Sequence, residues 1–284
     1  MYVARFFIPF HVKFAFMEIQ TGTWFGVMVL VCWGLGCADD PVEQASPIAE
    51  VPELAVDSAA VAAKSKILAY PPLTDANCAE FLSTWVNEHP NTQGQLIEVD
   101  TKFGRLTLEL FDDVPLHAAN FRYKISRGYY APSEFVRVVP EFVVQGGNSE
   151  DTRAQEMRWL IGKHTLPSEF KDEYRHFRGA LAMGRTYKGN PEKRSASYDF
   201  YIVVGRKVGS AELQQIEREK GIKYTEAQKQ RYLSEGGTPH LDGEHTVFGR
   251  LVSGFDVLDL LSQVPTDESD WPLQRLEMHV SGVN

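Results

Sequence analysis

Cysteine is scarce in this sequence, and positive charge is outweighed by negative charge. The 284 residues include three cysteines, and 38 Asp and Glu stand against 29 Lys and Arg, for a net charge of −9. Because Cys32 and Cys37 lie in or directly after an N-terminal apolar run, only Cys78 lies in the body of the chain, which excludes a disulfide framework and a cysteine-ligated metal site. The acidic balance argues against a nucleic-acid-binding protein. The composition, 43% hydrophobic and 24% charged, suits one full-sized globular domain with attached segments.

Long hydrophobic runs are also lacking. The longest, residues 24–36, is about thirteen residues long, whereas a membrane-spanning helix needs about 20. This length matches the apolar core of a secretory signal peptide, and Arg5 and Lys13 precede it. Either Met1 or Met17 is the start of translation, and a start at Met17 would remove both basic residues.

The apolar run ends in Gly-Leu-Gly-Cys at 34–37. This ending resembles the lipobox of bacterial lipoproteins, whose cysteine is lipidated and becomes the mature N-terminus, although Gly34 stands where leucine is usual. We therefore expect a signal peptide with a lipobox over residues 1–37, lipidation of Cys37, and a lipoprotein that is membrane-anchored in the cell envelope and faces the periplasm. An ordinary cleaved signal and an uncleaved anchor are the alternatives.

Two segments separate this leader from the main domain. Residues 38–70 are rich in Ala, Pro, Val, Asp and Glu without a sustained period, which predicts a flexible tether. Residues 71–94 are predicted to be an N-terminal helical segment, with one helix over 74–88 capped by Thr74. Its apolar residues, among them Cys78 and Leu82, form a single stripe that must be buried, so we interpret Cys78 as a core thiol.

The pattern changes to short strands from residue 95 to residue 284. Alternating polar and apolar residues predict a hairpin over 97–111, and further strands are predicted at the positions given at the end of this paragraph. Asp113 and Pro115 predict a helix that ends near Gly128, and a second helix is predicted over 255–262. These elements predict a mainly β protein, a closed antiparallel barrel capped by two helices. The strand positions are 97–101, 105–111, 134–139, 142–145, 179–183, 200–204, 246–252 and 276–280.

Residues 206–237 interrupt the strand pattern. The segments 210–220 and 225–234 are predicted to be helices, and Thr225 with Gln228 forms a capping box at the start of the second. We therefore predict a helical insertion between two strands of the barrel.

The most specific motif is Phe-Val-Arg-Val-Val-Pro-Glu-Phe-Val-Val-Gln-Gly-Gly-Asn at 135–148. It closely resembles the signature of the cyclophilins, Phe-His-Arg-Val-Ile-Pro followed by Phe-Met-Ile-Gln-Gly-Gly-Asp. Blocks at 104–121, 179–202 and 241–249 resemble other cyclophilin blocks in the same order, so the resemblance covers about residues 95–282. It implies an eight-stranded cyclophilin-like barrel and a peptidyl-prolyl cis-trans isomerase that needs neither cofactor nor metal. It also implies proline-containing polypeptides as partners, and we expect a monomer.

The chemistry of such an enzyme is electrostatic. Rotation about an X-Pro bond breaks amide resonance at a barrier of about 18–20 kcal/mol. In the twisted transition state the prolyl nitrogen gains a lone pair, so a donor aimed at this nitrogen stabilises that state more than either planar one. By the resemblance, Arg137 is this donor, and Gln145 is the second catalytic residue because it hydrogen-bonds the substrate backbone.

The resemblance also implies a substrate-binding pocket, in which several positions depart from the family. Arg185 and Asp199 replace Asn and Gln, and we expect them to pair beside the groove. Val136 replaces the His before Arg137, and Tyr201 replaces a Phe. A metal site formed by His240, Asp242 and His245 is an alternative interpretation of the last block. The expected pocket residues are Phe142, Val143, Gly184, Arg185, Asp199, Tyr201, His240, Leu241 and His245.

Two functions follow from these observations. The first is an isomerase that assists the folding of exported proteins in the cell envelope. The second is a non-catalytic prolyl-peptide-binding or assembly module on the same barrel, which the departures around Arg137 and the insertion at 206–237 favour. Loss of function on replacing Arg137 distinguishes them.

Overall fold

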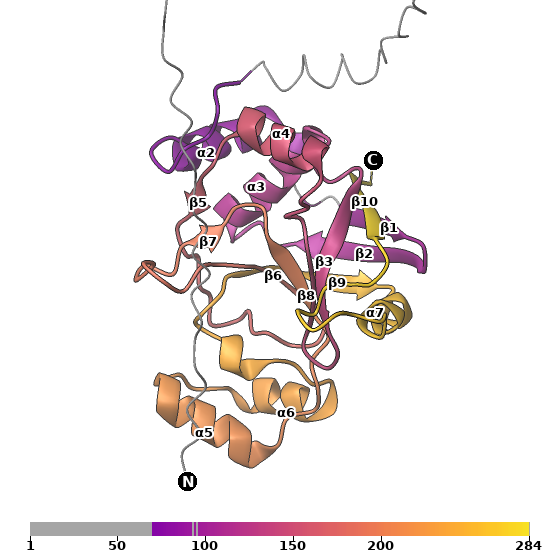
Figure 1. Ribbon diagram of the computed structural model, residues 1–284. Coiled ribbons are helices and arrows are strands. Elements are labelled where there is room, and N and C mark those ends of the chain that lie inside the picture. The colour runs from indigo at the N-terminus through magenta and orange to yellow at the C-terminus, as the bar shows by residue number, and fades with distance from the viewer. Residues whose placement is uncertain (1–69, 93, 95, 284) are drawn as a thin grey trace, which may run out of the picture. The chain divides into compact units, whose positions relative to one another are not determined.

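The computed structural model describes residues 70–92, 94 and 96–283. The predicted signal peptide, Cys37 and nearly all of the predicted tether lie outside these residues. Eight antiparallel strands close into one barrel in the order β1-β10-β3-β4-β8-β6-β9-β2, which confirms the predicted fold and leaves the sheet without an open edge (Figure 1). The strands are β1 (Leu96–Thr101), β2 (Gly104–Leu110), β3 (Ser133–Val139), β4 (Val143–Gly146), β6 (Ala180–Met183), β8 (Phe200–Val203), β9 (Val247–Ser253) and β10 (Leu276–Gly282).

On the strands β4, β6, β8 and β9, buried side chains lie on both the inner and the outer face of the barrel. Side chains alternate between the two faces of a strand. On β4 and β8, Val144 and Ile202 belong to the large cluster inside the barrel, whereas Val143 and Tyr201 belong to a separate apolar cluster. That second cluster also contains Leu241, which follows the insertion in the chain. A covered patch therefore lies on the outer face of the barrel, over β4, β6, β8 and β9.

Helices cover the barrel at its ends. The predicted helices are present as α2 (Cys78–Glu88), α3 (Pro115–Ser126), α5 (Ser210–Lys220), α6 (Glu226–Ser234) and α7 (Phe255–Ser262). The predicted capping box of Thr225 and Gln228 opens α6. The helices α3 and α7 pack against the barrel strands, and Figure 1 shows α2 on one side of the domain and the insertion helices α5 and α6 on the opposite side. Among the described residues, no helix is long and apolar enough to cross a bilayer.

The predicted caps of α2 and α3 were wrong. Asp113 does not cap α3, because its Oδ1 accepts a hydrogen bond from the Tyr174 hydroxyl at 2.7 Å. The residue before the helix is Val114, and the free N–H groups of Leu116 and His117 donate instead to Glu169, at 3.1 and 2.9 Å. Similarly α2 begins at Cys78 rather than Thr74. At α3, the carboxylate of Glu169, which is distant in the chain, thus replaces the expected local cap.

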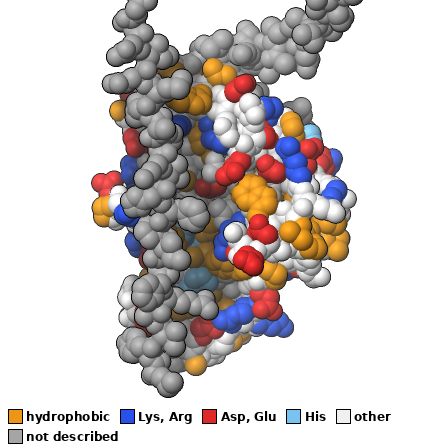
Figure 2. Space-filling model, in the orientation of Figure 1, with side chains coloured by type: hydrophobic (Ala, Val, Ile, Leu, Met, Phe, Trp, Pro, Cys, Tyr) orange, Lys and Arg blue, Asp and Glu red, His pale blue; other side chains and the backbone are white. Residues whose placement is uncertain are grey.

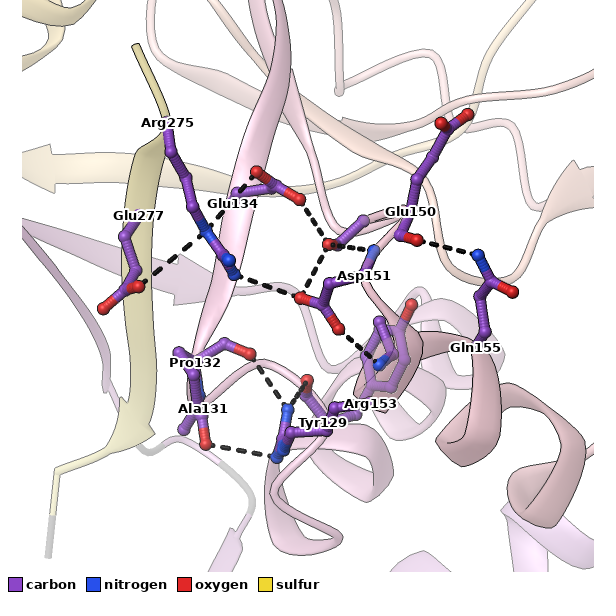
Figure 3. A network of polar contacts seen from close by, with 12 residues as sticks. Tyr129, Ala131, Pro132, Glu134, Glu150, Asp151, Arg153, Gln155, Arg275 and Glu277 are labelled. Atoms are coloured by element: carbon purple, nitrogen blue, oxygen red, sulfur yellow. Dashed lines mark hydrogen bonds and ion pairs between the residues drawn. The ribbon is translucent and has the colours of Figure 1, made fainter.

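One helix and one small sheet were not predicted. The helix α4 (Thr152–Ile161) is capped by Asp151, whose carboxylate accepts a hydrogen bond from the Ala154 N–H at 2.7 Å. Figure 3 shows the polar network around it: Arg153 donates to the carbonyl of Pro132 at 3.0 Å, and Arg275, directly before β10, reaches Asp151 at 3.1 Å. The short strands β5 (Thr165–Leu166) and β7 (Ser195–Ala196) pair nearby.

The surface carries both signs of charge. On the face shown in Figure 2, acidic and basic side chains are interspersed with small apolar patches. Ion pairs such as Arg105 with Asp100 and Arg250 with Glu109, each at 2.7 Å, hold strand side chains together. Because these pairs are exposed, they contribute little to stability.

The apolar stripe of α2 makes this helix part of the folded domain. Leu82 is fully buried, and Trp85 packs edge-on against Tyr123 of α3 with ring centroids 5.6 Å apart. We predict that Leu82→Ala lowers the free energy of unfolding by about 2–5 kcal/mol. The exposed Glu88→Ala in the same helix is the matched control and changes it by less than about 0.5 kcal/mol. Urea unfolding of both variants checks this, and an unchanged midpoint for Leu82→Ala contradicts it.

Candidate active site

A pocket of about 210 Å³ opens on the outer face of the barrel, beside the second apolar cluster. It brings together every expected site residue except Asp199 and His240, and it adds Tyr187. The lining residues are Arg137, Phe142, Val143, Gln145, Gly184, Arg185, Tyr187, Tyr201, Leu241 and His245.

Arg137 reaches this face because of the backbone of β3. The flanking Val136 and Val138 are buried, whereas the Arg137 side chain is 38% exposed. The pairing of β3 with β4 shifts register between Phe135 and Arg137, a bulge of the kind that re-aims a side chain. Arg137 then lies opposite Gln145 in the register, and its guanidinium carbon is 5.7 Å from the centre of the Phe142 ring.

An acidic partner of Arg137 was not predicted from the sequence. Asp270 accepts hydrogen bonds from Nε and Nη2 of Arg137 at 3.2 and 3.0 Å, both on Oδ2. Its carbonyl also accepts from the Val138 N–H at 2.9 Å, and its φ of +65° places it in the left-handed region that Asp tolerates better than most residues. Asp267 shapes this turn, because its Oδ1 accepts from the N–H of Trp271 at 2.9 Å.

The floor of the pocket is apolar. Val143, Tyr201 and Leu241 belong to the second cluster, and Phe142 packs against it. His240 lies outside the pocket, where it stacks on the Phe142 ring with centroids 5.4 Å apart. Burial lowers the pKa of His240.

The expected ion pair of Arg185 with Asp199 was wrong. Arg185 points toward the loop before β9, where its Nη2 meets Glu244 at 2.6 Å and its guanidinium lies 4.1 Å from the centre of the Tyr187 ring. Asp199 lies behind Gly184 and lines a different pocket, of about 290 Å³. Burial raises the pKa of its carboxyl, and the neighbouring Gln145 side chain partly offsets this effect.

His245 is held as a neutral imidazole. Its Nδ1 lies 3.1 Å from the carbonyl of Met183, so the ring proton is on Nδ1. Its Nε2 then accepts from the Tyr187 hydroxyl at 2.8 Å. Burial, reinforced by the neighbouring His176, lowers the pKa of His245 to about 4. Tyr187 is 64% exposed and lies in a loop without a motif, which is why the sequence did not indicate it.

The metal alternative has no support in the geometry. The carboxylate of Asp242 turns away from His240 and His245 and accepts from His176 and from two tyrosines instead. Among the described residues, no group of three or more His, Cys, Asp or Glu side chains could hold a metal ion.

This arrangement suits one kind of chemistry. A guanidinium lies beside an apolar floor, a neutral imidazole closes the far wall, and an amide side chain is available for backbone contacts. Such a pocket can accept an uncharged apolar ring and place a fixed hydrogen-bond donor next to it.

The sequence was also compared with known proteins. Residues 96–283 match the family described as Cyclophilin type peptidyl-prolyl cis-trans isomerase/CLD. A Streptococcus pyogenes protein whose name joins a phosphatase to a peptidyl-prolyl cis-trans isomerase is 37% identical over 185 residues, which span 64% of this chain and 37% of that protein. A Staphylococcus saprophyticus protein named as a peptidyl-prolyl cis-trans isomerase is 32% identical over 178 residues, 61% of this chain and 83% of that protein.

A solved structure has the same family name. The crystal structure of a Cryptosporidium parvum cyclophilin type peptidyl-prolyl cis-trans isomerase matches with a TM-score of 0.48 at 23% identity, over 67% of this chain and 98% of that one. The family match spans the whole barrel, from β1 to β10. The chain therefore belongs to the family of cyclophilin-type peptidyl-prolyl cis-trans isomerases, whose family match covers residues 96–283.

Proposed function

We propose that this chain catalyses cis-trans exchange of X-Pro bonds in exported polypeptides at the cell envelope, with Arg137 as the donor to the prolyl nitrogen. The observation that carries this proposal is the position of the Arg137 guanidinium, at the rim of an apolar pocket and 5.7 Å from the Phe142 ring. The proline ring lies on Phe142 and Leu241, and the twisting amide then lies under the guanidinium.

Catalysis comes from differential binding. The planar amide nitrogen is a poor hydrogen-bond acceptor because its lone pair is delocalised, and the twisted nitrogen is a good one. A donor that is already in place strengthens its bond only as the amide twists. Each 1.36 kcal/mol of such extra stabilisation corresponds to about a tenfold rate increase.

Asp270 keeps this donor in place. Its Oδ2 takes one proton from Nε and one from Nη2, so Nη1 and the second Nη2 proton stay free for substrate. Both partners are more than a third exposed, and such a pair contributes little to stability. Its effect is to restrict the guanidinium to one orientation, which is the preorganisation that electrostatic catalysis requires.

Gln145 lies opposite Arg137 in the register of β3 and β4, and both line the pocket. Its side-chain amide oxygen can accept a backbone N–H of the substrate. This contact holds the peptide on one side of the proline while the other side rotates.

The envelope location rests on residues 24–37 alone. An apolar run of signal-peptide length that ends at Cys37 supports lipidation, and the segment 38–70 is long enough to hold the domain away from a membrane surface. Slow proline isomerisation, at about 10–100 s per event, limits the folding of exported chains, and an anchored isomerase would act on them as they emerge.

A non-catalytic prolyl-peptide-binding module is the second candidate. The Asp270 carboxylate favours it, since it partly neutralises the Arg137 guanidinium that catalysis needs. The substitutions next to the pocket, Val136 and Arg185, favour it as well.

The two candidates differ in the effect of Arg137→Ala. On Suc-Ala-Xaa-Pro-Phe peptides, we expect the wild-type protein to accelerate exchange and Arg137→Ala to lower kcat/KM at least about 100-fold, the usual cost of removing one preorganised donor. Arg250→Ala, an exposed position of β9 that does not line the pocket, is the matched control and stays at the wild-type level. If the wild-type protein does not accelerate cis-trans exchange for several Xaa residues, the result supports the non-catalytic binding module instead.

Asp270→Asn tests the orientation of Arg137. Asn tolerates a positive φ, so the turn is kept while the ion pair is lost. We expect kcat to fall roughly three- to tenfold and KM to stay within about twofold, because ground-state binding is unaffected. A kcat at or above the wild-type value would show that Asp270 restrains the enzyme rather than preparing it.

Cys37→Ala tests the anchor. In a bacterial host supplied with labelled palmitate, we expect the full-length wild-type chain to carry label and to sediment with membranes. The Cys37→Ala variant should carry none, because the acylated sulfur is missing. Label-free wild-type protein in the soluble periplasmic fraction contradicts lipidation and leaves an ordinary cleaved signal.

A further inference from the structure

The helical insertion is connected to the proline pocket through buried hydrogen bonds. At the centre is Asp242, 1% exposed, which follows the pocket residue Leu241. Its Oδ2 accepts from the hydroxyls of Tyr224 and Tyr232 at 2.8 and 2.6 Å. Tyr232 is part of α6, and Tyr224 lies between α5 and α6, so both donors belong to the insertion.

The other carboxylate oxygen faces the barrel. Asp242 Oδ1 accepts from the backbone N–H and from Nδ1 of His176, each at 2.8 Å. The opposite ring nitrogen of His176, Nε2, lies 3.0 Å from the hydroxyl of Tyr201, whose ring forms the floor of the pocket. One carboxylate therefore joins two insertion tyrosines to one pocket side chain.

The ring of His176 bridges the two sides of this network. Its Nδ1 faces the Asp242 carboxylate and its Nε2 faces the Tyr201 hydroxyl. Hydrogen bonds from His176 and Tyr232 outweigh the effect of burial and keep the pKa of Asp242 below its usual value. Removing one of these donors leaves the buried negative charge of Asp242 less well compensated. We therefore expect the positions of its remaining hydrogen-bond partners to change.

The network also touches the pocket wall directly. Asp242 lies between Leu241 and His245 in the chain, and its carbonyl accepts from Nζ of Lys220, at the end of α5, at 2.9 Å. The insertion thus fixes both the backbone that carries Leu241 and, through His176, the ring of Tyr201. These are the two apolar surfaces on which a proline ring rests in the proposed function.

We propose that Asp242, His176, Tyr224 and Tyr232 are positioning residues, through which the insertion sets the affinity of the proline pocket by orienting Tyr201. The insertion is then a specificity element of the isomerase site. A partner that binds the insertion and shifts these tyrosines would change substrate affinity without touching Arg137. This inference rests on the proposed function only in the identity of the substrate.

A double-mutant cycle in the full-length protein tests the connection. Tyr232→Phe removes one donor to Asp242, and Tyr201→Phe removes the hydroxyl through which the effect reaches the pocket. We expect Tyr232→Phe to raise both KM and the Kd of a Suc-Ala-Ala-Pro-Phe peptide about three- to tenfold, with kcat within about twofold. In the Tyr201→Phe background the same change should alter Kd less than about 1.5-fold, because the contact between His176 and the Tyr201 hydroxyl is already missing.

Two comparisons make the outcome decisive. Gln214→Ala, on the exposed side of α5, is the matched control and leaves Kd unchanged. Tyr224→Phe removes the other donor to the same oxygen and replaces Tyr232→Phe if that variant does not fold, as judged by its thermal transition. The inference is overturned if the Tyr→Phe change leaves Kd unaltered, or if it has the same effect with and without the Tyr201 hydroxyl. Because Kd is measured without turnover, a wild-type protein that binds but does not isomerise refutes the proposed function and still completes this cycle.

Discussion

The closed barrel places one constraint on all other features: every strand has one face inside and one outside. Val138 and Val144 fill the interior, so their neighbours Arg137 and Val143 must lie outside. A second apolar layer over β4, β6, β8 and β9 then creates a pocket on the outer surface, while the interior stays packed. The site is therefore supported by a rigid sheet.

Carboxylates from distant loops hold these features in place. Glu169 binds the N-terminus of α3, Asp270 binds Arg137, and Asp242 joins the insertion to the barrel. Each accepts at least two hydrogen bonds, so each fixes the direction of the group it binds. The Asp242 carboxylate is fully buried, so its hydrogen bonds hold the insertion on the barrel. The Asp270 carboxylate is 40% exposed, and its hydrogen bonds orient the Arg137 side chain alone.

The sequence predicted what depends on local pattern. The alternation of polar and apolar residues predicted strands such as 105–111. The motif at 135–148 predicted the pocket residues around Arg137. The sequence missed α4, because the ten residues of this helix form no apolar stripe and its ends depend on Asp151, Arg153 and Arg275. It also missed contacts between residues far apart in the chain: Asp270 is 133 positions from Arg137, and Glu244 rather than Asp199 pairs with Arg185. Local pattern carries no information on these pairs.

The most direct test of the central claim separates exchange from binding at equilibrium. A proline-containing peptide is mixed with a small fraction of the full-length protein, and two-dimensional exchange NMR follows the cis and trans proline signals. The account predicts cross-peaks between them at mixing times far below the uncatalysed exchange time of about 10–100 s. Shifted peptide signals without such cross-peaks would contradict it, because they would show a pocket that holds proline without turning the bond.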